Sequence, residues 1–218
     1  MVEYLGQAKQ DEFVMKVLKY KREGFFLEIG ANDPVLINNT YVLESVYGWK
    51  GLMVEYDKSF EDSYKLKRKS HYVIQDARTI DYEALFAAYK FPKNMDYLQI
   101  DLEVSQNSTL QTLELLDRTV FKNYTFAVVT FEHDIYCGDL FSTRERSREI
   151  FSRNGYVRVF QDVKNYGNPY EDWYVYPSLV DMDFINKIKS EESLEWTEII
   201  DSINKEEANA CSFSSAPV

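Results

Sequence analysis

Acidic residues follow the apolar runs of this 218-residue sequence, and their type and placement suit the binding of a polar ligand. Glu55, Asp76 and Asp101 each come directly after such a run. Carboxylates accept hydrogen bonds from hydroxyl and ammonium groups, and sets of them bind hard divalent cations. Ligands of open α/β sheets lie beyond the carboxyl ends of the strands, so this recurrence predicts one site there. The candidate residues after the runs are Glu28, Gly30, Asn32, Asp33, Glu55, Asp76, Asp101, Glu103, Glu132, His133 and Asp134.

The spacing of the first candidates indicates a nucleoside. Gly30 lets the backbone approach a ligand closely, because it has no Cβ. Glu55 follows at 55 − 30 = 25 residues, about the offset at which an acid on the second strand binds ribose hydroxyls. Asp76 would then accept from the exocyclic amine of adenine, and Asp101 would hold an α-ammonium group.

The turn after the first run separates two kinds of nucleoside ligand. A dinucleotide site has the pattern G-x-G-x-x-G, which seats a pyrophosphate on a helix N-terminus. This chain has Glu28-Ile-Gly-Ala-Asn-Asp-Pro34, which lacks the later glycines and whose carboxylates repel a pyrophosphate. The turn therefore favours the cationic S-adenosylmethionine. Two alternatives remain: an NAD(P)- or nucleotide-sugar-dependent Rossmann enzyme, and a non-catalytic glycan-binding module.

Short apolar runs alternate with helical patterns, which predicts a doubly wound, mostly parallel seven-stranded α/β sheet with helices on both faces. No long helix separates the last two strands, so we expect an antiparallel hairpin at one edge. Strands are predicted at Phe25–Ile29, Gly51–Tyr56, Tyr72–Gln75, Tyr97–Ile100, Thr125–Phe131, Tyr156–Asp162 and Trp173–Tyr176. Helices are predicted at 11–22, 40–47, 58–69, 81–90, 108–117 and 141–154.

The length fits a single domain over residues 1–201, with an N-terminal helix in 1–23. Residues 202–218 lack a clear apolar period and are predicted to form a disordered polar tail.

Charge and cysteine content limit the partners and the setting. The 36 acidic residues outnumber the 25 basic ones, so the net charge of −11 disfavours nucleic acid as a partner. The basic run Lys65-Leu-Lys-Arg-Lys69 is interpreted as the solvated end of a helix. Cys137 and Cys211 form no CxxC pair, and no signal peptide or membrane span is apparent. We expect a reducing, cytoplasmic setting, which for a viral chain is the host cytoplasm.

In combination, seven segments resemble the FkbM-type methyltransferases, a family that uses S-adenosylmethionine and many of whose members O-methylate sugars. The resemblance covers roughly residues 10–180 and implies a Rossmann-like class I methyltransferase fold. One departure is Pro34, which stands where the family usually has glycine. The matching segments are Gln10-Asp-Glu-Phe-Val, Gly24-Phe-Phe-Leu-Glu-Ile-Gly-Ala-Asn-Asp33, Asn38-Asn-Thr-Tyr-Val-Leu-Glu44, Gly48-Trp-Lys-Gly-Leu-Met-Val-Glu55, Asp96-Tyr-Leu-Gln-Ile-Asp-Leu-Glu103, Phe131-Glu-His-Asp134 and Glu171-Asp-Trp-Tyr-Val-Tyr-Pro177.

The resemblance also assigns cofactor residues. The methionine side is expected to contact the turn after the first strand and the start of the following helix. The ribose and the adenine are expected to lie at the ends of the second and third strands. The residues so implied are Glu28, Gly30, Asn32, Asn39, Thr40, Glu55, Tyr56, Asp76 and Ala77.

Methyl transfer to a hydroxyl needs a general base or a metal ion, because a protonated alcohol is a poor nucleophile. Asp101, Glu132 and His133 are the candidate ligands for Mg²⁺ or Mn²⁺. His133 has two other readings, as the general base and as a structural histidine, and Asp101 and Glu103 are further catalytic candidates. The acceptor, a small molecule or a sugar hydroxyl of a glycan, is expected to lie against Asp134, Asp172 and Trp173, an aromatic face being a common platform for sugars.

Overall fold

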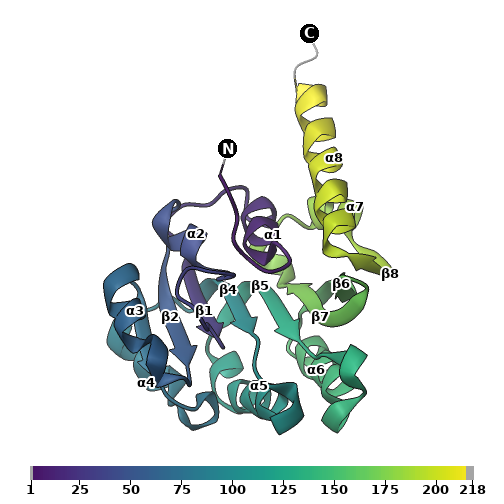
Figure 1. Ribbon diagram of the computed structural model, residues 1–218. Helices are drawn as coiled ribbons and strands as arrows, with labels where there is room; N and C mark the ends of the chain where they lie inside the picture. Colours follow the sequence, from purple (N-terminus) through teal and green to yellow (C-terminus); the bar gives the residue numbers. More distant parts are fainter. Residues whose placement is uncertain (1, 215–218) are drawn as a thin grey trace.

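The computed structural model describes residues 2–214 and contains one mixed sheet. Within these residues the sheet has eight strands in the order β3-β2-β1-β4-β5-β7-β6-β8 (Figure 1). The five strands from β3 to β5 run parallel, β7 is antiparallel to β5, and β6 is antiparallel to β7. The strands are β1 (Phe25–Ile29), β2 (Lys50–Glu55), β3 (His71–Ile74), β4 (Asn94–Ile100), β5 (Thr125–Glu132), β6 (Val157–Asn165), β7 (Asn168–Val175) and β8 (Ser190–Glu195).

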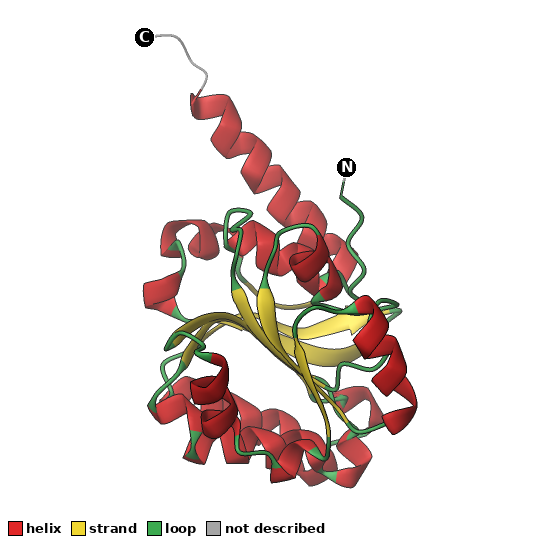
Figure 2. Cartoon of the chain, turned by 90° about the vertical axis from the view of Figure 1, so that its left-hand side faces the viewer, coloured by secondary structure: helices red, strands yellow, loops and turns green. Residues whose placement is uncertain are grey.

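Helices cover both faces of the sheet, so the strands are seen between two helical layers in Figure 2. One core lies between the sheet and α1, α2, α3, α7 and α8. The other lies between the sheet and α4, α5 and α6. The helices are α1 (Gln10–Val17), α2 (Tyr41–Ser45), α3 (Glu61–Lys67), α4 (Tyr82–Tyr89), α5 (Ser108–Arg118), α6 (Thr143–Arg153), α7 (Met182–Ile188) and α8 (Trp196–Ser214).

Side chains at the strand ends start the helical turns that follow them. Asp57, Asp76 and Glu103 each accept a hydrogen bond from a backbone N–H at the start of a short 3-10 helix, and Asp81 caps α4 in the same way. Strand order reverses between β1 and β4, where successive connections leave the sheet on opposite sides. This crevice is where a doubly wound sheet binds ligands.

The predicted sheet is confirmed, with differences at its edge. All seven predicted strands are present within a few residues, and β6 and β7 form the expected antiparallel hairpin. The structure adds an eighth strand, β8, which pairs parallel to β6 in an irregular register. No helix among the described residues is long and apolar enough to cross a membrane.

The predicted disordered tail differs from the structure over residues 202–214, which continue helix α8. Ile199, Ile200 and Ile203 are buried at helical spacing and anchor the start of this helix in the core. Glu207 then pairs with Lys16 of α1, at 2.7 Å between Oε2 and Nζ. Residues 215–218 lie outside the described part of the chain.

Candidate active site

A cavity of about 710 Å³ opens at the carboxyl ends of the parallel strands, over the point where strand order reverses. Eight carboxylate residues line it. Among the described residues of the lining, Arg78 is the single cationic one. The site therefore favours a cationic ligand over a polyanion. Its lining consists of Gln7, Glu28, Gly30, Ala31, Asn32, Asp33, Leu36, Ile37, Asn39, Glu55, Tyr56, Asp76, Ala77, Arg78, Asp101, Leu102, Glu103, Gln106, Ser108, Glu132 and Asp134.

The turn after β1 depends on Gly30. Its φ of +83° is a left-handed conformation that favours glycine, and a Cβ at this position would lie 1.6 Å from the carbonyl oxygen of Asp101. The Gly30 N–H donates to the carbonyl of Val54 at 2.9 Å, which continues the β1–β2 ladder into the turn. The close approach of the β1 and β4 ends brings Gly30 and Asp101 to the same cavity.

Glu28 organises the loop that follows this turn. Its side chain is buried, and its two oxygens accept hydrogen bonds from the Asn39 N–H at 3.1 Å and from the Thr40 hydroxyl at 2.6 Å. Burial raises the pKa of Glu28 to about 7, although the Arg68 charge and these hydrogen bonds oppose the shift. Asn39 lines the cavity, whereas Thr40 lies behind it and does not. Glu28 and Thr40, which were predicted to contact the cofactor, are thus hydrogen-bonded to each other.

Arg68 holds the same loop from the other side. Its guanidinium donates to the Pro34 carbonyl at 3.1 Å, to the Asn38 side chain at 3.0 Å and to the Thr40 hydroxyl at 2.8 Å. The side chain is fully buried, and Nε lies 3.4 Å from Glu44 Oε1. The interpretation of the basic run as a solvated helix end is therefore wrong for Arg68. Pro34, the departure from the family pattern, fits this loop because only its carbonyl is used.

Glu55 joins the ends of β1 and β2. Its Oε2 accepts from the Asn32 N–H and its Oε1 from the N–H groups of Tyr56 and Asp57, each at 2.7 Å. Asn32 has a φ of +48°, which asparagine tolerates, and its carbonyl accepts from the Tyr64 hydroxyl at 2.8 Å. Oε2 has a further lone pair, so Glu55 can still accept from a ligand in the cavity. Tyr56 stands on the rim with 75% of its side chain exposed.

Asp76 lies at the end of β3 with Ala77, and both line the cavity. Arg78 donates to Asp76 through Nε at 2.9 Å and Nη2 at 2.6 Å. These hydrogen bonds are the main reason why the pKa of Asp76 lies below its ordinary value. Asp76 is thus a fixed, ionised acceptor, and Arg78, which the sequence analysis did not select, is its partner.

Three carboxyl groups meet at the ends of β4 and β5. The Glu132 carboxyl lies between those of Asp101 and Asp134 and exchanges hydrogen bonds with both, which requires shared protons. Burial and mutual repulsion raise the pKa of Glu132 well above its ordinary value, and burial also raises the pKa of Asp101. Asp134 has a buried oxygen, Oδ1, without a hydrogen-bond partner. Glu103 lines the cavity nearby and binds the Ser105 hydroxyl at 2.6 Å.

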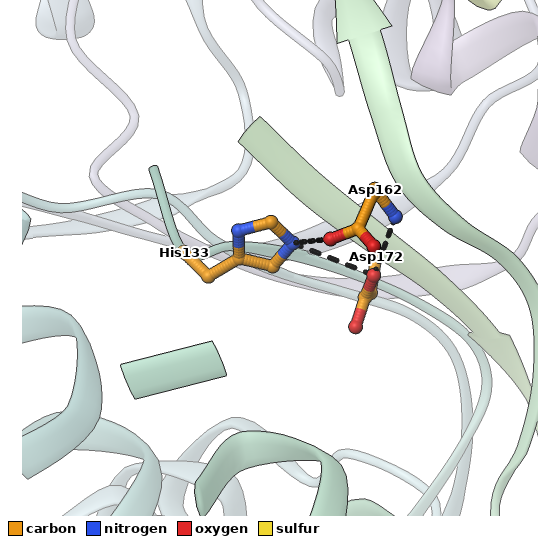
Figure 3. Close-up of side chains that lie close together, drawn as sticks. All are labelled: His133, Asp162 and Asp172. Atoms are coloured by element: carbon orange, nitrogen blue, oxygen red, sulfur yellow. Dashed lines mark hydrogen bonds and ion pairs between the residues drawn. The ribbon is translucent and has the colours of Figure 1, made fainter. Parts of the chain in front are cut away.

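His133 does not line the cavity and instead points toward Asp162 and Asp172 (Figure 3). The strand ends at Glu132, and Asp134 has a φ of +48°, so the turn that follows β5 brings Glu132 and Asp134 to the cavity lining but not His133. His133 is 1% exposed, and its Nε2 lies 3.4 Å from Asp172 Oδ1 and 3.5 Å from Asp162 Oδ1. The structure therefore separates His133 from Asp101 and Glu132, the two residues with which it was expected to bind a metal.

The His133–Asp162–Asp172 group is a potential three-ligand metal site by distance, but Arg148 already occupies it. Arg148 donates to Asp172 through Nε at 2.7 Å and to Asp162 through Nη2 at 3.0 Å. Asp172 also accepts from the Tyr174 hydroxyl at 2.9 Å. Burial favours a neutral Asp172, but the hydrogen bonds from Arg148 and the nearby His133 outweigh it and hold the pKa well below its usual range.

Arg148→Met should lower the free energy of unfolding by about 3–5 kcal/mol, because it leaves the buried Asp172 carboxylate without its main counterion. Arg153→Met on the same helix is the matched control, since Arg153 pairs with Asp117 at an exposed position and should change stability by about 0–1 kcal/mol. Urea unfolding of both variants measures the difference. Equal losses would show that the group around Asp172 is not stabilised by its ion pair.

Asp172 and Trp173 were expected to lie against the acceptor, but neither lines the cavity. Trp173 is 0% exposed and stacks on Phe13 of α1, with ring centroids 4.6 Å apart. Asp172 is also 0% exposed, and its carboxylate accepts a hydrogen bond from Arg148. Both lie on β7, an interior strand that is covered on each face, so neither side chain is available as a sugar platform. Asp134 is the one predicted acceptor residue that lines the cavity.

Glu171 is a further buried carboxyl that the sequence analysis did not select. It pairs with Glu132 across β5 and β7, and Gln10 of α1 donates to its Oε1 at 2.8 Å. Burial raises the pKa of Glu171 from 4.5 to about 8, although the hydrogen bond from Gln10 opposes the shift.

The raised pKa of Glu171 predicts a pH-dependent stability. The folded chain binds the Glu171 proton more tightly than the unfolded chain, so this contribution to stability is complete below about pH 4.5 and is lost as the pH rises toward about 8. Glu171→Gln should reduce the loss of unfolding free energy over this window by up to about 1.4 kcal/mol per pH unit. Urea titrations at several pH values measure it, with the exposed Glu192→Gln as the control. A variant with the wild-type pH profile would contradict the assignment.

Comparisons with known proteins agree on the architecture. No protein family model matches the chain, and no curated protein matches its sequence. A solved structure described as an O-methyltransferase from Klebsiella pneumoniae shares 11% identity, with a TM-score of 0.51 over 78% of this chain and 80% of that chain. Another, described as an rRNA methylase from Clostridium thermocellum, shares 10% identity, with a TM-score of 0.50 over 80% of this chain and 97% of that chain. The chain thus has the Rossmann-like class I methyltransferase fold, and membership of the FkbM-type family stays a prediction.

Proposed function

We propose that the protein is an S-adenosylmethionine-dependent O-methyltransferase whose acceptor is a hydroxyl of a sugar or glycan. The observation that carries the proposal is the charge of the cavity, which has eight carboxylate residues against one arginine that is already paired with Asp76. A sulfonium and an α-ammonium group are attracted by such a lining, whereas a pyrophosphate is repelled. The sugar acceptor rests on the resemblance to the FkbM-type family.

Each part of the cofactor has a complementary group in the cavity. Glu55 would accept from the ribose hydroxyls, and Asp76 from the adenine amine beside Ala77. The methionine end would lie beside Gly30, which lines the cavity, and near Asn39, whose Oδ1 is buried without a partner. Glu28 would act indirectly, by holding the loop that carries Asn39.

The reaction is an in-line displacement in which the acceptor oxygen bonds to the methyl carbon as the carbon–sulfur bond breaks. S-adenosylhomocysteine leaves with both electrons of that bond. The acceptor hydroxyl loses its proton, and the carboxylates of Asp101, Glu132 and Asp134 are the groups placed to receive it. Alignment of the acceptor with the methyl group supplies the rest of the catalysis.

The same three carboxyl groups would supply the oxygen ligands that a hard divalent cation such as Mg²⁺ or Mn²⁺ prefers. All their donors are oxygen atoms, and Asp134 Oδ1 has no protein partner. A bound cation would lower the pKa of the acceptor hydroxyl. Asp134 thus takes the place that the sequence analysis gave to His133.

Two measurements test the proposal. S-adenosylhomocysteine should raise the melting temperature, and NAD should not; stabilisation by NAD instead would favour a dinucleotide-dependent enzyme. Transfer of labelled methyl from S-adenosylmethionine to a panel of glycans should then give product, and EDTA should abolish it if the carboxyl groups act through a cation. Binding of the cofactor without transfer to any hydroxyl would argue for a non-catalytic module.

A further inference from the structure

The loop between β1 and α2 carries two exposed apolar side chains at the mouth of the cavity. Leu36 is 68% exposed and Ile37 is 64% exposed, and both line the cavity. Single exposed apolar residues are normal on a protein surface. Two adjacent ones at the rim of a cavity with an acidic lining are better explained by a ligand that covers them.

The backbone at Ile37 is strained. Its φ is +56°, in the left-handed region, which is a clear outlier for a β-branched residue. Strain of this kind persists only where the surroundings impose it, and it is concentrated at functional sites. Asparagine or glycine would fit the same backbone at lower cost, so the isoleucine side chain is retained against a local preference.

The loop is held firmly on both sides of the tip. The Asp33 carboxylate accepts from the N–H groups of Val35 and Leu36, each at 2.8 Å. The Pro34 carbonyl is bound by the buried Arg68, and the Asn39 N–H is bound by Glu28. The two apolar side chains are thus presented by a fixed loop.

The anchors also locate the tip. The loop starts beside Asn32, whose N–H binds Glu55, and ends beside Asn39, whose N–H binds Glu28. Leu36 and Ile37 therefore rise between the group assigned to the ribose and the loop assigned to the methionine end. We infer that Leu36 and Ile37 form an apolar cover that packs on bound S-adenosylmethionine between its ribose and its sulfonium centre.

This cover would keep water from the reacting centre. Methyl transfer disperses the positive charge of the sulfonium, and water stabilises the concentrated charge of the ground state more than the dispersed charge of the transition state. The inference rests on the proposed function, because it takes S-adenosylmethionine as the occupant of the cavity. It adds two residues that neither the motif nor the carboxylates indicate.

Ile37→Asn tests the backbone strain at this position and the apolar contact with the ligand separately. Asparagine tolerates a positive φ, so the variant should unfold at a higher urea concentration than the wild type. It also loses the apolar contact, so the Kd for S-adenosylhomocysteine, measured by calorimetry, should rise about tenfold. Leu36→Ser should weaken binding in the same direction without the gain in stability.

Two control variants match these changes away from the cavity. Tyr166 lies in the β6–β7 turn with a φ of +53° and is 93% exposed, so Tyr166→Asn should raise stability and leave the Kd unchanged. Leu66 on α3 is 83% exposed, and Leu66→Ser removes an exposed leucine without touching the cavity lining.

A second readout does not depend on the variants. In protein labelled at isoleucine δ1 methyl groups, the Ile37 signal should shift on addition of S-adenosylhomocysteine, whereas the signal of the buried Ile185 should not. If the wild type binds this ligand but the Ile37 methyl does not shift and Ile37→Asn keeps the wild-type Kd, the cover is disproved and the proposed function stands. If the wild type does not bind it at all, the proposed function fails first.

Discussion

Gly30→Ala should be the most damaging single methyl addition in the chain, with an expected loss of about 4 kcal/mol or more in the free energy of unfolding. The added Cβ would meet the Asp101 carbonyl oxygen at 1.6 Å, and that oxygen belongs to the backbone at the end of β4. Neither strand can move away, because β1 and β4 are hydrogen-bonded neighbours in the middle of the sheet. Urea unfolding and calorimetric titration with S-adenosylhomocysteine measure the effects on stability and on binding.

Gly48→Ala is the matched control for this variant. Gly48 also has a positive φ, +75°, but a Cβ there has no other atom within 4 Å. Its substitution should cost only the left-handed backbone preference, about 1 kcal/mol. The difference between the two variants isolates the steric contact. Comparable losses would mean that the turn after β1 opens readily, and that the close approach of β1 and β4 is not a fixed feature of the site.

Asp101→Asn should lower kcat by about 10²–10⁴-fold once an acceptor is known. The substitution keeps the shape of the side chain but removes a carboxylate from the set that would take the acceptor proton or bind a cation. Burial raises the pKa of Asp101, so the rate should increase with pH as the carboxyl group ionises, and this rise should be lost in the variant. Labelled-methyl transfer over a range of pH gives both results.

Glu103→Gln provides the comparison within the same cavity. Glu103 was a second candidate for the base, but its Oε1 caps the short helix that follows β4 and is bound by Ser105. A loss of kcat much smaller than that of Asp101→Asn is expected. The reverse order would move the catalytic role from the Asp101 cluster to Glu103.

The central sheet and the cofactor side of the cavity could be predicted because both depend on local sequence. Buried parallel strands appear as nearly continuous apolar runs, and the bounds of β1 agree residue for residue. The residue after such a run must lie at the carboxyl edge, which brings Glu55, Asp76 and Asp101 to one cavity. Their spacing required no knowledge of distant contacts.

The misplaced residues depend on which face of a strand they occupy or on partners far away in the chain. Glu132, His133 and Asp134 are adjacent, and only the turn that ends β5 at Glu132, with a left-handed Asp134, leaves the middle residue out of the cavity lining. His133 then meets Asp162, which is 29 residues later in the chain and was not a candidate. Arg68 looked like a solvated charge, but it follows the end of α3 in an extended conformation, and its partners Pro34, Asn38 and Thr40 lie about 30 residues earlier in the chain.

The carboxyl-terminal elements were missed for a different reason. The β8 segment, Ser190-Glu-Glu-Ser-Leu-Glu195, contains one apolar residue and forms a strand because the edge of β6 offers unpaired backbone groups. In α8 the apolar residues Trp196, Ile199 and Ile203 have helical spacing. The polar residues that follow them directly do not continue this pattern, so the helix was not predicted.

The turn at the end of β5 divides neighbouring residues between two regions of the molecule. Glu132 and Asp134 belong to the reactive cavity, while His133 belongs to a buried polar group with Arg148 on the opposite side. Substitutions at positions 132 and 134 should therefore change the chemistry of the cavity. Position 133 can be used to adjust thermal tolerance, and the choice of acceptor would be left as it is.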